Sequence, residues 1–166
     1  LGPDGWQQIA NFVVFGLLTA LSSIAWRAAL APGRGSIAIP ALKVVIGGAL
    51  VVAGLSLTDL PGAAGATAHG AIHNLASYLA MIGTWVSCFV FAARFAVERG
   101  WRAWSPFAIL TGLLVIVCLA GMGMAIGQHG DVGLFERLAS LAPLPLGLAT
   151  AVRLLAGNCR LSAAAA

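Results

Sequence analysis

Long apolar runs separated by short polar breaks make up most of this 166-residue chain. Each run exceeds the roughly 20 residues that an α-helix needs to cross the hydrocarbon core of a bilayer. The runs are continuous, whereas a transmembrane barrel needs alternating strands of about ten residues. The pattern therefore predicts an all-α, polytopic transmembrane helical bundle forming a single domain, residues 1–166. The predicted helices cover about residues 6–30, 37–57, 67–97, 106–127 and 132–156.

The composition supports a membrane protein and changes the picture of its partners. Only 8% of the residues are charged and 60% are hydrophobic, whereas a soluble domain typically carries about 25% charged residues. The formal charge of +4 does not indicate a nucleic-acid partner, because the basic residues lie at helix ends and form no stripe. Lys43 lies one to two turns inside the second predicted helix, where its amine is expected to snorkel to the near interface. Membrane lipids are the expected partners.

The longest polar break, residues 58–74, joins the second predicted helix to the third and reads TDLPGAAGATAHGAIHN. His69 and His73 are four residues apart, which places both on one face of a helix. Two imidazoles at that spacing can hold one metal ion. Asp59 from the break and His129 from the next loop on the same side are candidates to complete a divalent-metal site.

Three interpretations of these residues remain open. The first is a structural polar clamp in which Asp59, His69 and His73 are hydrogen-bonded loop anchors. Glu136 and Arg137, in the first turn of the last predicted helix, are assigned to this clamp as an ion pair. The second interpretation is the metal site, and the third is haem ligation. Haem requires axial ligands on opposite sides of its ring, which two histidines on one helix face cannot supply.

The basic residues divide unequally between the two sides of the predicted bundle. When the loops are assigned alternately, one side receives Arg27, Arg34, Lys43, Arg94, Arg99, Arg102, Arg153 and Arg160. The other side receives Arg137. Cytoplasmic loops carry an excess of Lys and Arg, so the first side is predicted to be cytoplasmic. The N-terminus of this segment then lies outside and its C-terminus in the cytoplasm. Five helices with an outside start and no initiator methionine suggest a sixth helix before Leu1.

Several short motifs resemble one known family. In chain order they are GPDGW with QQIANF, GRGS, TDLPG, HGAIHN and GLFER. They resemble a bacterial six-helix membrane family catalogued as domain of unknown function 998, over nearly the whole chain. The family has proline directly after the Asp of its TD motif, whereas here Leu60 intervenes before Pro61. The resemblance implies a six-helix fold in a bacterial plasma membrane. It implies no established activity, substrate or catalytic residue.

Residues within the later helices give local expectations. Pro143 and Pro145 predict a kink in the fifth helix, because each proline removes a backbone donor. Gly123 and Gly127 form a small-residue pair that allows close approach of a helix, either inside the bundle or from a partner.

The loop between the third and fourth predicted helices, together with the end of the third, gives two further expectations. Trp101 and Trp104 are expected to be interfacial belt residues. Glu98 lies between Arg94 and Arg99 and is expected to form a surface ion pair.

Two classes of function remain open. The chain contains no P-loop, GxSxG or CxxC motif and no charge at the centre of a predicted helix. These features favour a membrane component that has no catalytic residues. It is either an accessory subunit of a larger membrane complex, with other membrane proteins as partners, or a helical protein that binds a lipid or a pigment. The alternative is a metal-dependent membrane hydrolase that uses the outer His and Asp residues.

Overall fold

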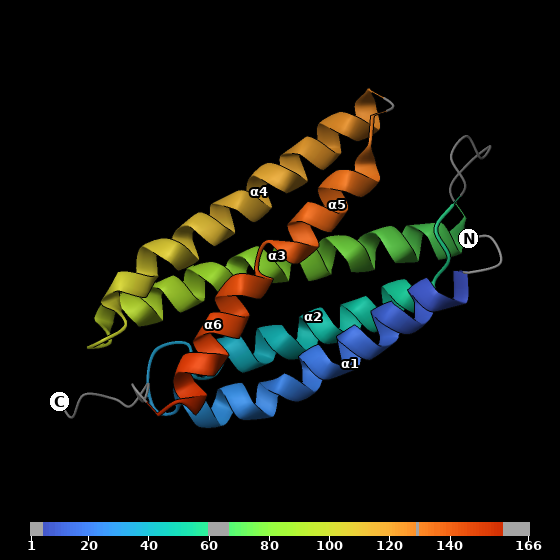
Figure 1. Ribbon diagram of the computed structural model, residues 1–166. Coiled ribbons are helices and arrows are strands. Elements are labelled where there is room, and N and C mark those ends of the chain that lie inside the picture. The colour runs from blue at the N-terminus through green and yellow to red at the C-terminus, as the bar shows by residue number, and fades with distance from the viewer. Residues whose placement is uncertain (1–4, 60–66, 129, 158–166) are drawn as a thin grey trace.

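The computed structural model describes residues 5–59, 67–128 and 130–157 (Figure 1), and every regular element in these ranges is a helix. The elements are α1 (Gly5–Leu30), α2 (Ala38–Leu55), α3 (Ala68–Val97), the 3-10 turn η1 (Arg102–Trp104), α4 (Ser105–Gly127), α5 (Val132–Leu141) and α6 (Leu144–Leu155). Within the described ranges, five segments are long and apolar enough to cross a membrane, with α5 and α6 together forming the fifth. The predicted all-α membrane fold is confirmed, and the helix limits lie within two residues of the expected ones.

The fifth membrane segment is broken between α5 and α6. Helix α5 ends at Leu141 and α6 begins at Leu144, so Ala142 and Pro143 separate them. Pro143 has no N–H to continue the hydrogen-bond ladder of α5. Pro145 lies in the first turn of α6, where a missing backbone donor is tolerated. The predicted kink is therefore confirmed.

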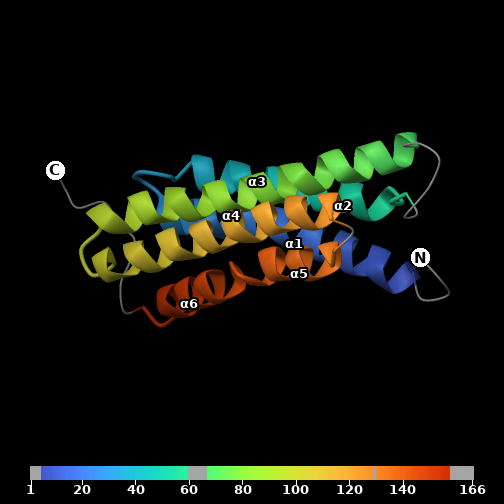
Figure 2. The ribbon, with the colours of Figure 1, turned by 90° about the horizontal axis from the view of Figure 1, so that it is seen from above.

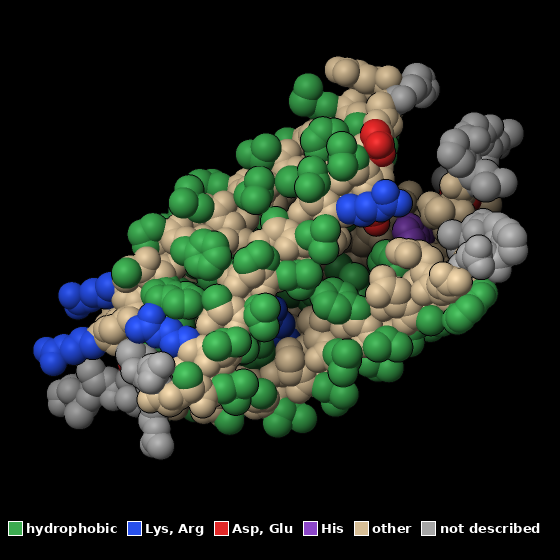
Figure 3. Space-filling view, viewed as in Figure 1, with side chains coloured by type: hydrophobic (Ala, Val, Ile, Leu, Met, Phe, Trp, Pro, Cys, Tyr) green, Lys and Arg blue, Asp and Glu red, His purple; other side chains and the backbone are tan. Residues whose placement is uncertain are grey.

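The helices pack in chain order, with α1 on α2, α2 on α3, α3 on α4 and α4 on α5. Seen from above, they run along one common direction (Figure 2). The α5–α6 segment crosses the front of the bundle obliquely (Figure 1). Large apolar side chains are exposed along all six α-helices, and they cover the middle of the surface in Figure 3. A membrane protein with this surface contacts lipid directly.

Helices α1 and α2 approach closely because glycine stands where their backbones cross. A Cβ atom added at Gly47 would overlap the carbonyl oxygen of Gly16 and lie 2.6 Å from the Ala20 nitrogen. One added at Gly54 would lie 2.6 Å from the Cβ of Phe12. Small residues allow membrane helices to pack backbone against backbone, so these glycines fix α1 beside α2.

The two ends of the bundle differ in charge. We call the end where α1 and α3 finish the basic end, and the other the opposite end. Lys and Arg side chains gather at the basic end, at the left of Figure 3. The described residues of the basic end include Arg27, Arg34, Arg94, Arg99, Arg102 and Arg153. Those of the opposite end include Asp59, His69, His73, Asp131, Glu136 and Arg137.

Trp101 is a core residue of the basic end. Its side chain is fully buried and stacks on Phe95, with ring centroids 5.0 Å apart. The guanidinium carbon of Arg153 lies 4.7 Å from the centre of the Trp101 ring, and Arg153 also donates to the carbonyl of Gly100 at 2.6 Å. The expectation that Trp101 lies in an interfacial belt is wrong, because α6 folds back over this loop.

Arg94 and Glu98 form an ion pair in the interior. Arg94 Nη2 lies 3.3 Å from Glu98 Oε2, and the two side chains are 2% and 11% exposed. The Arg94 guanidinium also donates to the carbonyl of Arg34 at 3.4 Å. A Cβ atom at Gly33, whose φ is +146°, would overlap this guanidinium. The pair is therefore not the predicted surface pair, because the loop between α1 and α2 closes over it.

Candidate functional site

The beginning of the polar break is held to the start of α3 by Asp59. The amide of Thr67 donates to Asp59 Oδ2 at 3.1 Å, and the Thr67 hydroxyl donates to Asp59 Oδ1 at 2.6 Å. The Thr67 oxygen in turn accepts from the amide of Gly70 at 3.0 Å. A carboxylate near the N-terminus of a helix is also favoured by the helix dipole. These contacts cap α3 and fix the path of the chain into it.

His73 connects α3 to the end of α2. Its Nδ1 atom lies 2.8 Å from the carbonyl oxygen of Ala53 and 2.9 Å from that of Ser56. A carbonyl oxygen can only accept, so Nδ1 carries the proton and donates to both. The last carbonyls of a helix have no partner within it, and His73 satisfies two of them. The imidazole ring lies 6.4 Å from the ring of Phe12 on α1.

The other described residues of the two predicted sets make none of these contacts. His69 is exposed on the first turn of α3, and Arg137 is exposed on α5. His129 lies outside the described residues. Across the parts of the chain that the structure describes, no three His, Cys, Asp or Glu side chains are grouped to hold a metal ion. Asp59 and His73 both join α2 to α3, but through separate partners. The metal site and the five-residue clamp both stay predictions.

A cavity of about 580 Å³ lies inside the bundle, between α1, α2 and α3 on one side and α5 and α6 on the other. On the face drawn in Figure 3 it is visible as a hollow with a basic side chain inside it. Most of its wall is apolar and includes Phe12, Phe15, Leu50, Met81 and Leu146. The cavity was not predictable from the sequence, because its walls come from helices that are distant in the chain.

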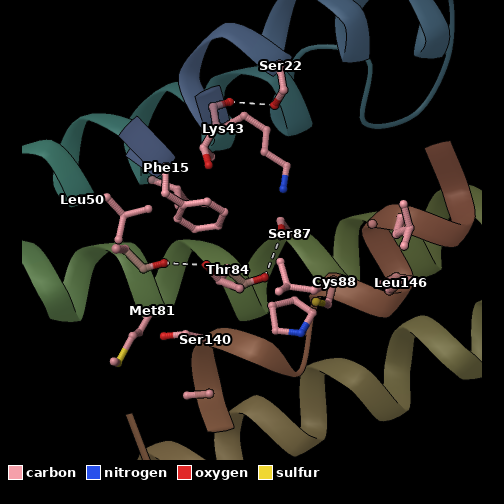
Figure 4. Close-up of a pocket in the computed structure, with 18 of the residues that line it drawn as sticks. Phe15, Ser22, Lys43, Leu50, Met81, Thr84, Ser87, Cys88, Ser140 and Leu146 are labelled. Carbon is pink, nitrogen blue, oxygen red and sulfur yellow. Dashed lines mark hydrogen bonds between the residues drawn. The ribbon is translucent and has the colours of Figure 1, made fainter. Parts of the chain in front are cut away.

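Seven serine and threonine hydroxyls of the described residues line the cavity, and five of them donate their protons to carbonyls of their own helices. The donors are Ser22, Thr84, Ser87, Ser140 and Thr150, at distances of 2.6–2.9 Å. Three of these bonds are drawn in Figure 4. A hydroxyl has one donor and two acceptor positions, so these groups present acceptors to the cavity. The hydroxyl of Ser77 is buried and has no hydrogen-bond partner within the described ranges.

Lys43 extends its amine into the cavity, toward the part of α3 that carries Ser87 and Cys88 (Figure 4). It makes no hydrogen bond or salt bridge to any residue that the structure describes. Glu136, on α5, also lines the cavity. Lys43 was expected to snorkel to the interface, but it forms part of an interior wall. The available sequence signal was a lone lysine inside an apolar run, because an ionisable residue within a membrane helix is by default a candidate functional site.

Comparisons with known proteins give a family and no nearer relative. No curated protein and no solved structure matches the chain. The family model described as "Protein of unknown function (DUF998)" matches residues 1–153. Because the match covers most of the chain, as the sequence motifs predicted, this polytopic membrane protein belongs to the DUF998 family.

Proposed function

We propose that this chain is a non-catalytic membrane protein that holds a lipid molecule inside its helical bundle. The cavity of about 580 Å³ between α1–α3 and α5–α6 is the observation that carries the proposal. Small-molecule sites typically occupy about 300–1,000 Å³, with apolar walls and a few polar groups. This cavity has that size and composition, and it lies among membrane-spanning helices.

The length of the cavity suits an acyl chain. Along α3 its wall extends from Ser77 to Phe91, which at a helical rise of 1.5 Å per residue is about 21 Å. One leaflet contributes about half of the roughly 30 Å hydrocarbon core. An extended acyl chain of one leaflet therefore fits beside α3. It can enter from the surrounding bilayer through the hollow in Figure 3 without crossing water.

The chemistry of the walls favours binding over catalysis. The described lining residues include serine hydroxyls, Cys88, Lys43 and Glu136, but no histidine. A serine or cysteine nucleophile needs an adjacent base or an environment that activates it. Here five of the lining hydroxyls donate their protons to backbone carbonyls, as at Ser87, which donates to Thr84 at 2.7 Å. An apolar ligand would leave these hydrogen bonds intact.

Native mass spectrometry of the protein, extracted in mild detergent, tests this proposal. The wild-type protein should carry a lipid adduct. Ala151→Phe, which places a ring in the cavity wall, should lose the adduct. Ala120→Phe, on the exposed face of α4, should keep it and is the matched control. Absence of an adduct from the wild type, with no thermal stabilisation by added lipids, would contradict the proposal. Visible absorbance of the purified protein would instead identify the ligand as a pigment.

A role as accessory subunit of a larger membrane complex is a second candidate. A Cβ atom added at Gly123 or Gly127 on α4 would meet no described atom within 4 Å. Within the described bundle this small-residue face is therefore open, and such faces allow close packing of another membrane helix. Mild detergent should then extract the protein together with other membrane proteins. A solitary, monodisperse protein under those conditions counts against this role.

The metal-dependent hydrolase remains the alternative from another class. This alternative rests on Asp59, His69 and His73 at the opposite end, together with His129. Elemental analysis of the purified protein tests it directly, because a hydrolase of this kind must retain stoichiometric metal.

A further inference from the structure

We propose that the lipid in this cavity has an oxyanion head group, a carboxylate or a phosphate, that pairs with the amine of Lys43. This inference rests on the proposed lipid-binding function and specifies the ligand of that same site. It follows from the position of Lys43, from the donors that the cavity offers and from the charge at its two ends.

Lys43 lies near one end of the cavity. It is five residues from the start of α2 at Ala38, or about 8 Å along the helix, and α2 starts at the basic end. The amine points toward Ser87 and Cys88 (Figure 4). Leu50 and Met81, further along the cavity, are apolar. A head group at Lys43 therefore places its chain along the apolar part of the cavity.

Among the described lining residues, Lys43 supplies the positively charged hydrogen-bond donors. A lysine amine carries three N–H donors and no acceptor. The hydroxyls of Ser22 and Ser87, which line the cavity with it, donate to their own helices. Beside Lys43, a head group that needs acceptors would find these neutral hydroxyl oxygens, whereas an oxyanion needs donors and finds the amine. The amine of Lys43 thus favours an anion at this end of the cavity.

Glu136 contributes the opposite charge at the other end. It lies four residues from the start of α5 at Val132, and α5 starts at the opposite end of the bundle. Like charges in a medium of low dielectric constant repel strongly. An anionic head group is therefore disfavoured near Glu136 and favoured near Lys43, which fixes the direction of the bound chain.

An unpaired amine in an apolar cavity is costly, so a neutral ligand of the same shape leaves that cost in place. A site with a buried polar group discriminates strongly against ligands that do not pair with it.

The probes are palmitate, hexadecyl phosphate and hexadecanol, which share a chain length and differ in head group. We expect palmitate or hexadecyl phosphate to bind the wild type about ten- to a hundredfold more tightly than hexadecanol. The stronger of the two anions shows whether carboxylate or phosphate is preferred.

Lys43→Gln should reduce the affinity for both anions about ten- to a hundredfold and leave hexadecanol binding unchanged. Lys43→Arg should retain the preference for anions. Arg137→Gln, at an exposed position outside the cavity lining, is the control and should bind as the wild type does.

Equal binding of all three probes to the wild type would overturn the role of Lys43 while leaving lipid binding intact. That comparison requires no variant, so it holds even if Lys43→Gln does not fold. Unchanged anion affinity in a folded Lys43→Gln protein would also overturn the role of Lys43 in binding the head group. Failure of every probe to bind would instead remove the proposed function itself.

Discussion

His73 of α3 donates to the carbonyl oxygen of Ala53, 2.8 Å away in the last turn of α2. The contact joins two helices across the polar break between them, over 20 residues of sequence. It shows how one side chain can complete a helix end in a membrane protein, where water is scarce and unpaired carbonyls are costly.

We expect His73→Ala to lower the free energy of unfolding by about 1–3 kcal/mol, because the carbonyls of Ala53 and Ser56 lose their donor. Thermal unfolding followed by circular dichroism measures the change. His69→Ala, at an exposed position on the same helix, is the control and should have little effect. A chelator should leave the wild type unchanged if His73 acts through hydrogen bonds. A chelator that reproduces the His73→Ala effect would favour the metal site.

Gly47→Ala should strongly destabilise the packing of α1 on α2, because its Cβ would overlap the backbone of Gly16. Overpacking of this kind typically costs about 1–3 kcal/mol. Gly48→Ala is a closely matched control, since a Cβ there would meet no described atom within 4 Å. That variant should be neutral or slightly stabilising because alanine favours helix. Equal thermal stability of the two variants would contradict the close approach of α1 and α2.

Glu98→Gln should destabilise the basic end by about 3 kcal/mol, because it leaves the buried Arg94 guanidinium without its carboxylate. Arg99→Gln, at an exposed neighbouring position, should cost little. Adding Arg94→Met to Glu98→Gln should recover part of the loss. Arg94→Met alone completes the comparison. If the double variant loses as much free energy of unfolding as the two single variants together, the pair is not coupled.

The asymmetry of basic residues predicts the orientation of the chain in the membrane. In a background without native cysteines, Cys replacing the exposed Gln128 should react with an impermeant thiol reagent added outside the cell. Cys replacing the exposed Ala103, at the basic end, should react only after the membrane is permeabilised. The reverse labelling pattern would invert the assignment of the two sides.

The helices were predictable from sequence because their signal is local. A run such as residues 106–127 is apolar throughout, and Pro143 interrupts its helix by its own chemistry. The surroundings of Arg94 and Trp101 were not predictable, because chain segments distant in sequence cover them. Both were placed at the surface by their position near a loop.

The candidate site depends even more on tertiary structure. The four-residue spacing of His69 and His73 predicted a shared helix face, but the partners of His73 are backbone carbonyls of another helix. Backbone carbonyls carry no sequence signature. Lys43 was visible as a lone charge in an apolar run, whereas the cavity that receives its amine exists only once α1, α2, α3 and α5–α6 are assembled.

The break between α5 and α6 has a consequence for how the backbone meets its surroundings. Pro143 and Pro145 cannot donate to the carbonyls four residues earlier, those of Ala139 and Leu141. Non-helical backbone at membrane depth is tolerated where it faces protein or a cavity rather than lipid tails. Ala139 and Pro143 both line the cavity. The fifth segment therefore consists of two helices joined by non-helical backbone. The surroundings of the carbonyls at this junction depend on what occupies the cavity beside them.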